Sequence, residues 1–175
     1  MNVHRHYHKR LALAFDDVFE CKNYAEHYLK NHKGKLGSKE RIIHDALLTA
    51  LVVSYGRIFS KSYADNNQYN SDTSKKFKAF VQKKLSKLLA KEEKLHQYLM
   101  KQRDTIFAHS DAKAYDLVPY KIFDSIGYIG NNTFYGYTND IVETIMHILN
   151  YFNEEILNEQ ESLITQYPHA FEDIN

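Results

Sequence analysis

The sequence contains little cysteine, proline or glycine, and each shortage excludes a class of structure. Cys21 is the only cysteine among 175 residues, so neither an internal disulfide nor a cysteine-based zinc site can form. This composition suits a reducing compartment, and we expect a cytoplasmic protein. The two prolines, Pro119 and Pro168, and the six glycines leave long stretches without a helix breaker. Long helices are therefore favoured over strands and turns.

The sequence also lacks a long hydrophobic run. A membrane-spanning helix needs roughly 18 or more apolar residues, and the most apolar stretch, residues 46–55, is shorter and lies in an amphipathic segment. The N-terminus begins with basic residues but has neither a long apolar core nor a small-residue cleavage site, unlike a secretory signal. We predict that the chain has no membrane segment and no membrane partner.

What the sequence does contain suits a single globular domain. A hydrophobic content of 43% is typical of a chain with a packed core. Domains of about 150 residues bury enough surface to be stable without disulfides or metals. No internal repeat and no linker divides the chain, so we predict one domain over residues 1–175.

Charge is nearly balanced, with a formal net charge of +1, which neither supports nor excludes a nucleic-acid partner. Lysines nevertheless gather in one part of the sequence: Lys75, Lys76, Lys78, Lys83, Lys84, Lys87, Lys91 and Lys94. They have two interpretations, a solvated helix face or a surface that faces phosphates.

Apolar residues recur at helical spacing in several segments. The pattern predicts helices at about 8–29, from Ser38 to about 61, and at 73–109 with a break near 90–92. A last helix follows Thr138, runs through residue 156 and extends as far as Leu163 if that residue continues the stripe. Ser38 and Thr138 are the expected N-caps. The second helix is apolar around much of its circumference, which is typical of a central helix.

The connections between these segments complete the predicted fold. Residues 62–72 are polar and turn-like, and residues 111–137 have an irregular pattern in which Gly130-Asn131-Asn132 is a possible hairpin turn. The sequence predicts an all-α, up-and-down bundle of four to five helices, with a possible small hairpin in 118–137. Most hydrophobic residues and many of the 14 tyrosines are thereby assigned to the core and its edge.

Arg103 is the first residue that suggests chemistry. Its neighbours three and four positions away on a helix are all apolar: Leu99, Met100, Ile106 and Phe107. A guanidinium beside a buried stripe must either extend to water or meet an anion. Arg103 is therefore a candidate for binding an anionic ligand.

His109 lies six residues beyond Arg103, near the expected end of the helix. A histidine in this position can cap the helix, because the helix dipole favours its cation. Asp104 and Asp111 each carry a carboxylate that could orient a neighbouring side chain. Residues six apart on a helix point roughly 120° away from each other. Arg103 and His109 can therefore converge if the helix ends early or if two chains share the site.

The segment Arg103 to Asp111, RDTIFAHSD, resembles the signature of the HEPN superfamily. That signature is an Arg, usually followed by a polar residue, and then a His after a short apolar spacer. Arg103, Asp104 and His109 match it, with five residues between the Arg and the His. The Arg-Asp pair before Ala-His and an acidic residue is similar to helical proteins of bacterial abortive-infection systems. The position of the motif, late in the penultimate long helix, extends the resemblance over most of the chain.

The resemblance implies a function. Catalytic HEPN proteins are metal-independent endoribonucleases in which two copies of the motif meet across a dimer interface. His109 would then transfer protons during attack of an RNA 2′-hydroxyl on the adjacent phosphate. Arg103 would hold that phosphate and stabilise its developing charge. The implied partners are RNA, a second copy of the chain and an antitoxin or other partner protein, and the implied setting is stress or phage defence without a cofactor.

The residue two positions after the histidine differs from that of HEPN toxins that are silenced by a partner nucleotidyltransferase. Those toxins have a tyrosine two residues after the histidine, where this chain has Asp111, and the next tyrosine is Tyr115. Asp111 is thus a candidate for orienting His109 instead. Two other functions remain open: a non-catalytic HEPN module that binds RNA, nucleotide or a partner protein, and a structural helical dimer whose interface contains Arg103 and His109.

The remaining histidines carry weaker signals. His4 and His8 would share a helix face, a spacing that can bind a metal, but no acidic residue or cysteine lies close by, and we assign His4, His6 and His8 to the surface. Other histidines lie within the predicted helices and are expected to be satisfied residues at the core edge: His27, His44, His96 and His147. The sequence has no glycine-rich phosphate loop, G-x-S-x-G elbow or HExxH motif. We predict no metal and no cofactor.

Overall fold

The computed structural model describes residues 3–31, 33–35, 37–59, 68–104, 118–122, 125–129 and 137–171. Within these ranges the elements are α1 (Val3–Lys30), α2 (Lys39–Phe59), α3 (Gln68–Leu85), α4 (Ala90–Gln102), β1 (Val118–Ile122), β2 (Ser125–Ile129), α5 (Asn139–Gln166) and a short 3-10 helix, η4 (Pro168–Ala170). The five α-helices form a bundle, which confirms the predicted all-α class.

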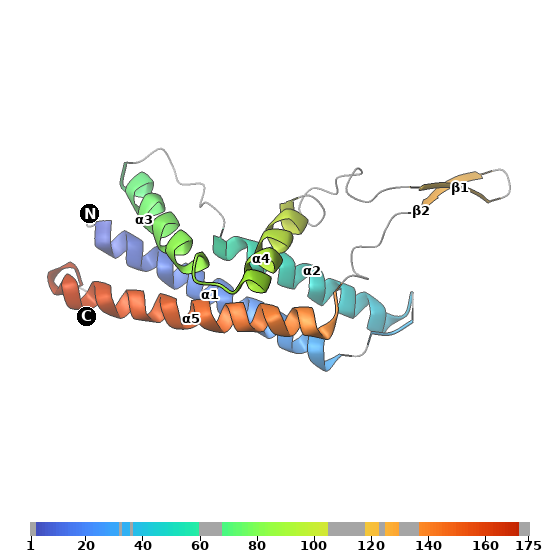
Figure 1. Cartoon of the computed structure of the whole chain (residues 1–175), viewed down its shortest axis with the longest axis horizontal. Coiled ribbons are helices and arrows are strands. Elements are labelled where there is room, and N and C mark those ends of the chain that lie inside the picture. Colours follow the sequence, from blue (N-terminus) through green and yellow to red (C-terminus); the bar gives the residue numbers. More distant parts are fainter. Residues whose placement is uncertain are drawn as a thin grey trace.

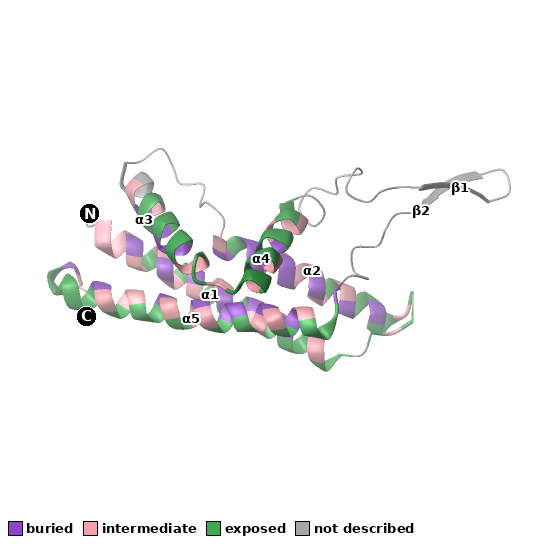
Figure 2. Ribbon diagram, in the orientation of Figure 1, coloured by how far each residue is buried: buried purple, intermediate pink, exposed green. Residues whose placement is uncertain are grey.

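The three long helices lie alongside one another, with both chain ends at the same end of the molecule (Figure 1). Helices α3 and α4 form a V against them, α3 on α1, and α4 on α2 and α5. Buried residues follow the sides of the helices that face one another (Figure 2), and side chains from all five helices join one hydrophobic core. The core is formed by apolar residues at helical spacing on each helix, as the sequence predicts.

The central helix is α1 rather than α2, so the predicted central helix was wrong. Helix α1 packs against α2, α3 and α5. It also begins at Val3, five residues earlier than the apolar pattern indicates. Two contacts hold this first turn: Arg5 Nε donates to the Ala170 carbonyl oxygen at 3.2 Å, and the His4 ring stacks on Tyr167. Both partners lie far away in sequence, so the pattern of the N-terminal segment could not reveal them.

In the first turns of α2, polar residues are buried and apolar residues are exposed, the reverse of an ordinary amphipathic helix. Ile42 and Ile43 belong to the apolar pattern that predicts this helix, but they are 64% and 42% exposed. Arg41 and His44 are buried instead. The apolar residues around the circumference of α2 made both faces suitable for burial, and only packing against α1 selected one of them.

Two capping predictions had different outcomes. Ser38 caps α2, since its Oγ accepts a hydrogen bond from the Arg41 N–H at 3.2 Å. Thr138 is the N-cap residue of α5, but its side chain makes no capping hydrogen bond. Its carbonyl oxygen instead accepts from the N–H groups of Ile141 and Val142.

The predicted break within residues 73–109 is confirmed, although it precedes residues 90–92. Helix α3 ends at Leu85, and the N–H groups of Lys87 and Leu88 bond to carbonyls three residues back, which tightens the last turn. Glu92 accepts a hydrogen bond from the Leu89 N–H at 3.0 Å. Glu92 therefore helps to start α4 and does not end α3. Helix α3 also begins at Gln68, so the predicted turn over 62–72 was wrong for residues 68–72.

A small antiparallel hairpin lies between α4 and α5 in sequence and apart from the helices in Figure 1. It falls within the predicted range 118–137, and the candidate turn at 130–132 lies outside the described residues. Strand β1 pairs with β2 in the register Val118 to Ile129 and Ile122 to Ser125. Residues 118–122 include β-branched and aromatic residues, which have a high strand propensity.

Helix α2 bears on the predicted absence of a membrane segment. Among the described helices, it is the one whose length and apolar composition would allow it to cross a membrane. A core helix of a soluble protein meets the same criterion, and α2 buries Leu48, Leu51, Val52, Tyr55 and Ile58 in the core. The absence of a membrane partner stays a prediction.

Candidate functional site

Arg103 and Asp104 lie together where α4 ends. Arg103 is the C-cap residue of α4, and its backbone N–H donates to the carbonyl oxygens of Leu99 and Met100. Arg103 Nη1 donates a hydrogen bond to Asp104 Oδ1 at 2.6 Å, and 29% of the Arg103 side chain is exposed. The guanidinium is thus oriented by a carboxylate and still accessible from solvent.

Gly56 of α2 provides the surface on which the Arg103 side chain lies. A Cβ atom at position 56 would be 2.7 Å from Arg103 Cγ and 2.8 Å from Cδ, closer than real side chains approach. Glycine in the middle of a helix costs about 1 kcal/mol relative to alanine, so the close approach of Arg103 gives it a structural reason. We overlooked Gly56 in the sequence. The available signal was a glycine inside an otherwise apolar helical segment.

The other half of the motif lies outside the described residues. His109 and Asp111 fall in the range 105–117, so the predicted meeting of Arg103 and His109 stays a prediction. The described part of the motif consists of a positioned cation and its carboxylate. Such a pair can bind one phosphate through the guanidinium fork.

His96 lies on the same face of α4 as Arg103, two turns earlier, and is a core residue. Its Nδ1 shares a hydrogen bond with the Tyr55 hydroxyl at 3.0 Å, and its ring meets Phe59 edge to face at 4.6 Å. Burial lowers the pKa of His96 to about 4. The ring is therefore neutral near pH 7 and holds α4 on α2 beneath Arg103. This histidine is satisfied, as predicted, although it is buried rather than at the core edge.

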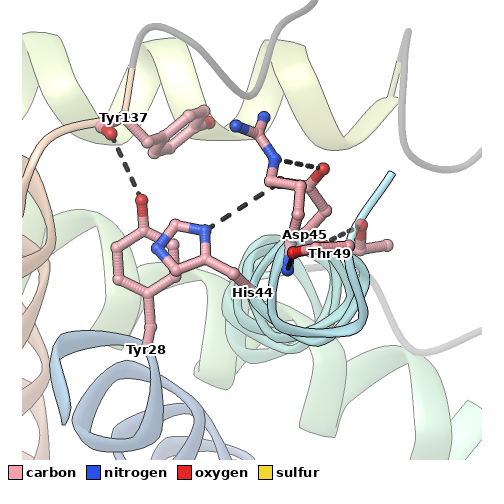
Figure 3. Close-up of polar contacts among 7 residues, drawn as sticks. Tyr28, His44, Asp45, Thr49 and Tyr137 are labelled. Carbon is pink, nitrogen blue, oxygen red and sulfur yellow. Dashed lines mark hydrogen bonds and ion pairs between the residues drawn. The ribbon is translucent and has the colours of Figure 1, made fainter. Parts of the chain in front are cut away.

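A second polar cluster is buried where α1, α2 and α5 meet (Figure 3). The Tyr28 hydroxyl donates to the Tyr137 carbonyl oxygen at 3.2 Å, and the Tyr28 ring packs on His44 at 4.0 Å between centroids. Arg41 Nε donates to Asp45 Oδ2 at 2.8 Å. The cluster thus joins an Arg, a His and an Asp, the residue types that also make up the predicted motif.

This cluster is too deeply buried to contact a polymer such as RNA. Arg41 and His44 are only 5% and 4% exposed. His44 Nδ1 lies 3.9 Å from Asp45 Oδ1, too far for a hydrogen bond. Burial lowers the pKa of His44, although Asp45 opposes this effect. Within the described chain, His44 Nδ1, Asp45 Oδ1 and Tyr137 Oη are buried without a hydrogen-bond partner, so the prediction that His44 is satisfied was wrong.

The N-terminal histidines pack against the other end of the chain. His4 stacks on Tyr167 with ring centroids 3.6 Å apart, and His8 meets Phe171 edge to face at 5.2 Å. Both side chains are partly buried, which corrects their assignment to the surface. Each faces its own aromatic partner. Over the described ranges, no group of three or more His, Cys, Asp and Glu side chains is arranged to hold a metal ion.

No family model matches the chain, and comparisons with curated proteins and with solved structures found no match either.

Proposed function

We propose that this chain is a metal-independent endoribonuclease of the HEPN type that acts as a cytoplasmic homodimer in stress or phage defence. The observation that carries the proposal is the position of Arg103, whose side chain lies on Gly56 and whose guanidinium pairs with Asp104 at the surface. A guanidinium fixed in this way is suited to bidentate recognition of a phosphate. The sequence RDTIFAHSD, which resembles the HEPN signature, adds His109 as the proton-transfer group.

In this mechanism Arg103 and His109 have separate roles. His109 takes the proton of an RNA 2′-hydroxyl, and the 2′-oxygen forms a bond to the adjacent phosphorus. The bond from phosphorus to the 5′-oxygen breaks, and the leaving oxygen takes a proton from His109 of a second copy of the chain. Arg103 stabilises the charge on the phosphate oxygens. The products are a 2′,3′-cyclic phosphate end and a 5′-hydroxyl end.

Asp104 orients the reaction centre in this proposal. Its Oδ1 accepts from Arg103 Nη1 and so fixes one corner of the guanidinium. Asp111 is proposed to hold His109 in one orientation. Arg103 and His109 then act together across the dimer, with each chain supplying one copy of the motif.

The test is cleavage of RNA by the purified protein in the presence of a chelator. Wild type is compared with His109→Ala and with His147→Ala, which removes an exposed histidine of α5 outside the motif. We expect 2′,3′-cyclic phosphate ends from wild type and from His147→Ala, and none from His109→Ala. Circular dichroism and size-exclusion chromatography establish matched folding and oligomeric state.

Equal cleavage by wild type and His109→Ala would remove His109 from the mechanism. RNA or nucleotide binding without cleavage, lost in Arg103→Ala, would favour the non-catalytic binding module. Loss of the dimer in Arg103→Lys without any RNA effect would point instead to a structural role at the interface.

A further inference from the structure

Charge is strongly segregated in this molecule although its net charge is only +1. Residues 68–104, which form α3 and α4, carry ten Lys or Arg residues and four Asp or Glu residues. Helix α5 carries six Asp or Glu residues and neither Lys nor Arg. A basic surface of this kind attracts polyanions even when the whole chain is almost neutral.

A groove of about 360 Å³ lies where the basic helix α3 meets the start of α1 and the end of α5. This volume is within the usual range of small-ligand sites, roughly 300–1,000 Å³. On α3 its wall includes Lys76, Ala79, Phe80, Lys83 and Lys84. These positions recur at helical spacing, so one face of α3 forms the wall.

The lysines of this wall differ in whether their charge is already neutralised. Lys84 forms an ion pair with Glu155 of α5, and both side chains are largely buried. Glu159, the acidic residue of the groove, accepts a hydrogen bond from the Tyr7 hydroxyl at 3.1 Å. Lys76 and Lys83 are exposed and form no ion pair with any residue that the structure describes. Two positive charges therefore remain for a ligand.

Aromatic rings also line the groove. His4 and Tyr167 line it as a stacked pair with 25° between the ring planes, and Tyr167 is 40% exposed. Burial, with a smaller contribution from the Lys76 charge, lowers the pKa of His4, so its ring is neutral near pH 7. Lys76 is thus close to the stacked pair, and an aromatic surface and a cation face the same space.

We propose that this groove is an accessory binding site for single-stranded RNA, in which Lys76 and Lys83 contact successive phosphates and the His4–Tyr167 pair stacks with a base. The two lysines are seven residues apart on α3, a rise of about 10 Å, which suits two phosphates of an extended strand better than one. Lysines beside exposed aromatic rings are the usual elements of single-strand recognition. The proposal rests on the proposed ribonuclease function and adds where the substrate is held.

An acidic protein segment is the competing occupant. Its carboxylates would use the two lysines but would not need the stacked rings. Glu159 in the groove disfavours a carboxylate and a phosphate alike. The aromatic lining is therefore the feature that favours a nucleobase.

The experiment measures binding separately from cleavage. A fluorescent 2′-O-methyl oligouridylate lacks the nucleophilic hydroxyl and stays intact, and its anisotropy reports affinity at several salt concentrations. Wild type is compared with Lys76→Gln/Lys83→Gln and with Lys91→Gln/Lys94→Gln, which removes the same charge from exposed positions of α4. We expect at least a tenfold weaker affinity for the first variant and a salt slope smaller by about 1.4, from about 0.7 per phosphate contact. The control should lose less than threefold.

A second variant, Tyr167→Leu, tests stacking. We expect about tenfold weaker RNA binding and unchanged binding of inorganic polyphosphate, with folding verified by circular dichroism. Equal losses in the two lysine variants, or no RNA binding by wild type, would overturn the proposal. Polyglutamate that binds as tightly as RNA and is insensitive to Tyr167→Leu would identify an acidic protein as the occupant and also overturn it.

The outcomes separate this site from the nuclease itself. RNA binding that depends on Lys76 and Lys83, with no cleavage of unmodified RNA by wild type, would overturn the proposed nuclease function and support the RNA site in the groove. Cleavage by wild type, together with full RNA affinity in Lys76→Gln/Lys83→Gln, would overturn the proposed RNA site in the groove and support the nuclease function.

Discussion

Arg41 and Arg103 form nearly the same pair with an aspartate and have opposite surroundings. Arg41 Nε lies 2.8 Å from Asp45 Oδ2, and Arg103 Nη1 lies 2.6 Å from Asp104 Oδ1. The Arg41 side chain is almost wholly buried, whereas the Arg103 guanidinium reaches solvent. A buried pair is costly to disrupt, and an exposed pair contributes little to stability but can exchange its partner for a ligand.

The largest expected effect concerns activity and depends on Arg103. Arg103→Ala should lower RNA cleavage by roughly 100- to 1,000-fold, the usual loss when one charge-stabilising donor is removed. The free energy of unfolding should change by less than about 1 kcal/mol, because the pair is exposed. Single-turnover cleavage and urea unfolding measure the two quantities. A large loss of stability would instead make Arg103 a structural residue like Arg41.

The reverse outcome is expected for Arg41. Arg41→Ala should lower the free energy of unfolding by about 3 kcal/mol, since it leaves Asp45 without its partner beside a buried cluster. Cleavage per folded molecule should stay within twofold of wild type. A variant that is as stable as wild type but inactive would show that the buried cluster takes part in the chemistry.

We expect low pH to reduce the stability of the folded chain through His96 and His44. Burial lowers the pKa of both residues in the folded chain, that of His96 to about 4, so the unfolded chain binds more protons below pH 6.5. Stability is therefore complete above pH 6.5 and is lost as pH falls toward 4. His96 alone should contribute about 2 kcal/mol of this loss between pH 7 and pH 5.

Urea unfolding at a series of pH values measures this dependence. His96→Gln keeps a hydrogen-bonding group near Tyr55 but does not titrate, so its stability should vary less with pH than that of wild type. An identical pH dependence in the two proteins would show that His96 is not protonated on unfolding in this range.

The smallest effect is expected at Gly56, which supports Arg103. Gly56→Ala should raise helix propensity by about 1 kcal/mol but displace the Arg103 side chain, so we expect about tenfold slower cleavage at nearly unchanged stability. Ala46→Gly, at an exposed position of α2, is the reverse substitution. It should lower stability and leave cleavage unchanged. Full activity in Gly56→Ala would mean that Arg103 does not need this position.

Part of the candidate site could be predicted from sequence. Arg103 stood out because apolar residues surround it at helical spacing, and Asp104 is its immediate neighbour. Gly56 did not stand out, because it contacts Arg103 from another helix, 47 positions away in sequence. The buried cluster was missed for the same reason, since Tyr28, His44 and Tyr137 come from three separate parts of the chain.

The sequence by itself determined the helical class, the Ser38 cap, the division between α3 and α4 and the polar residues available for chemistry. These properties depend on local spacing and on side chains a few residues apart. Only the tertiary structure decided which face of α2 is buried, that α1 is central, and which Arg–Asp pair reaches solvent. Burial is set by packing between distant segments, and an isolated helix with apolar residues on several faces does not specify which face its neighbours will cover.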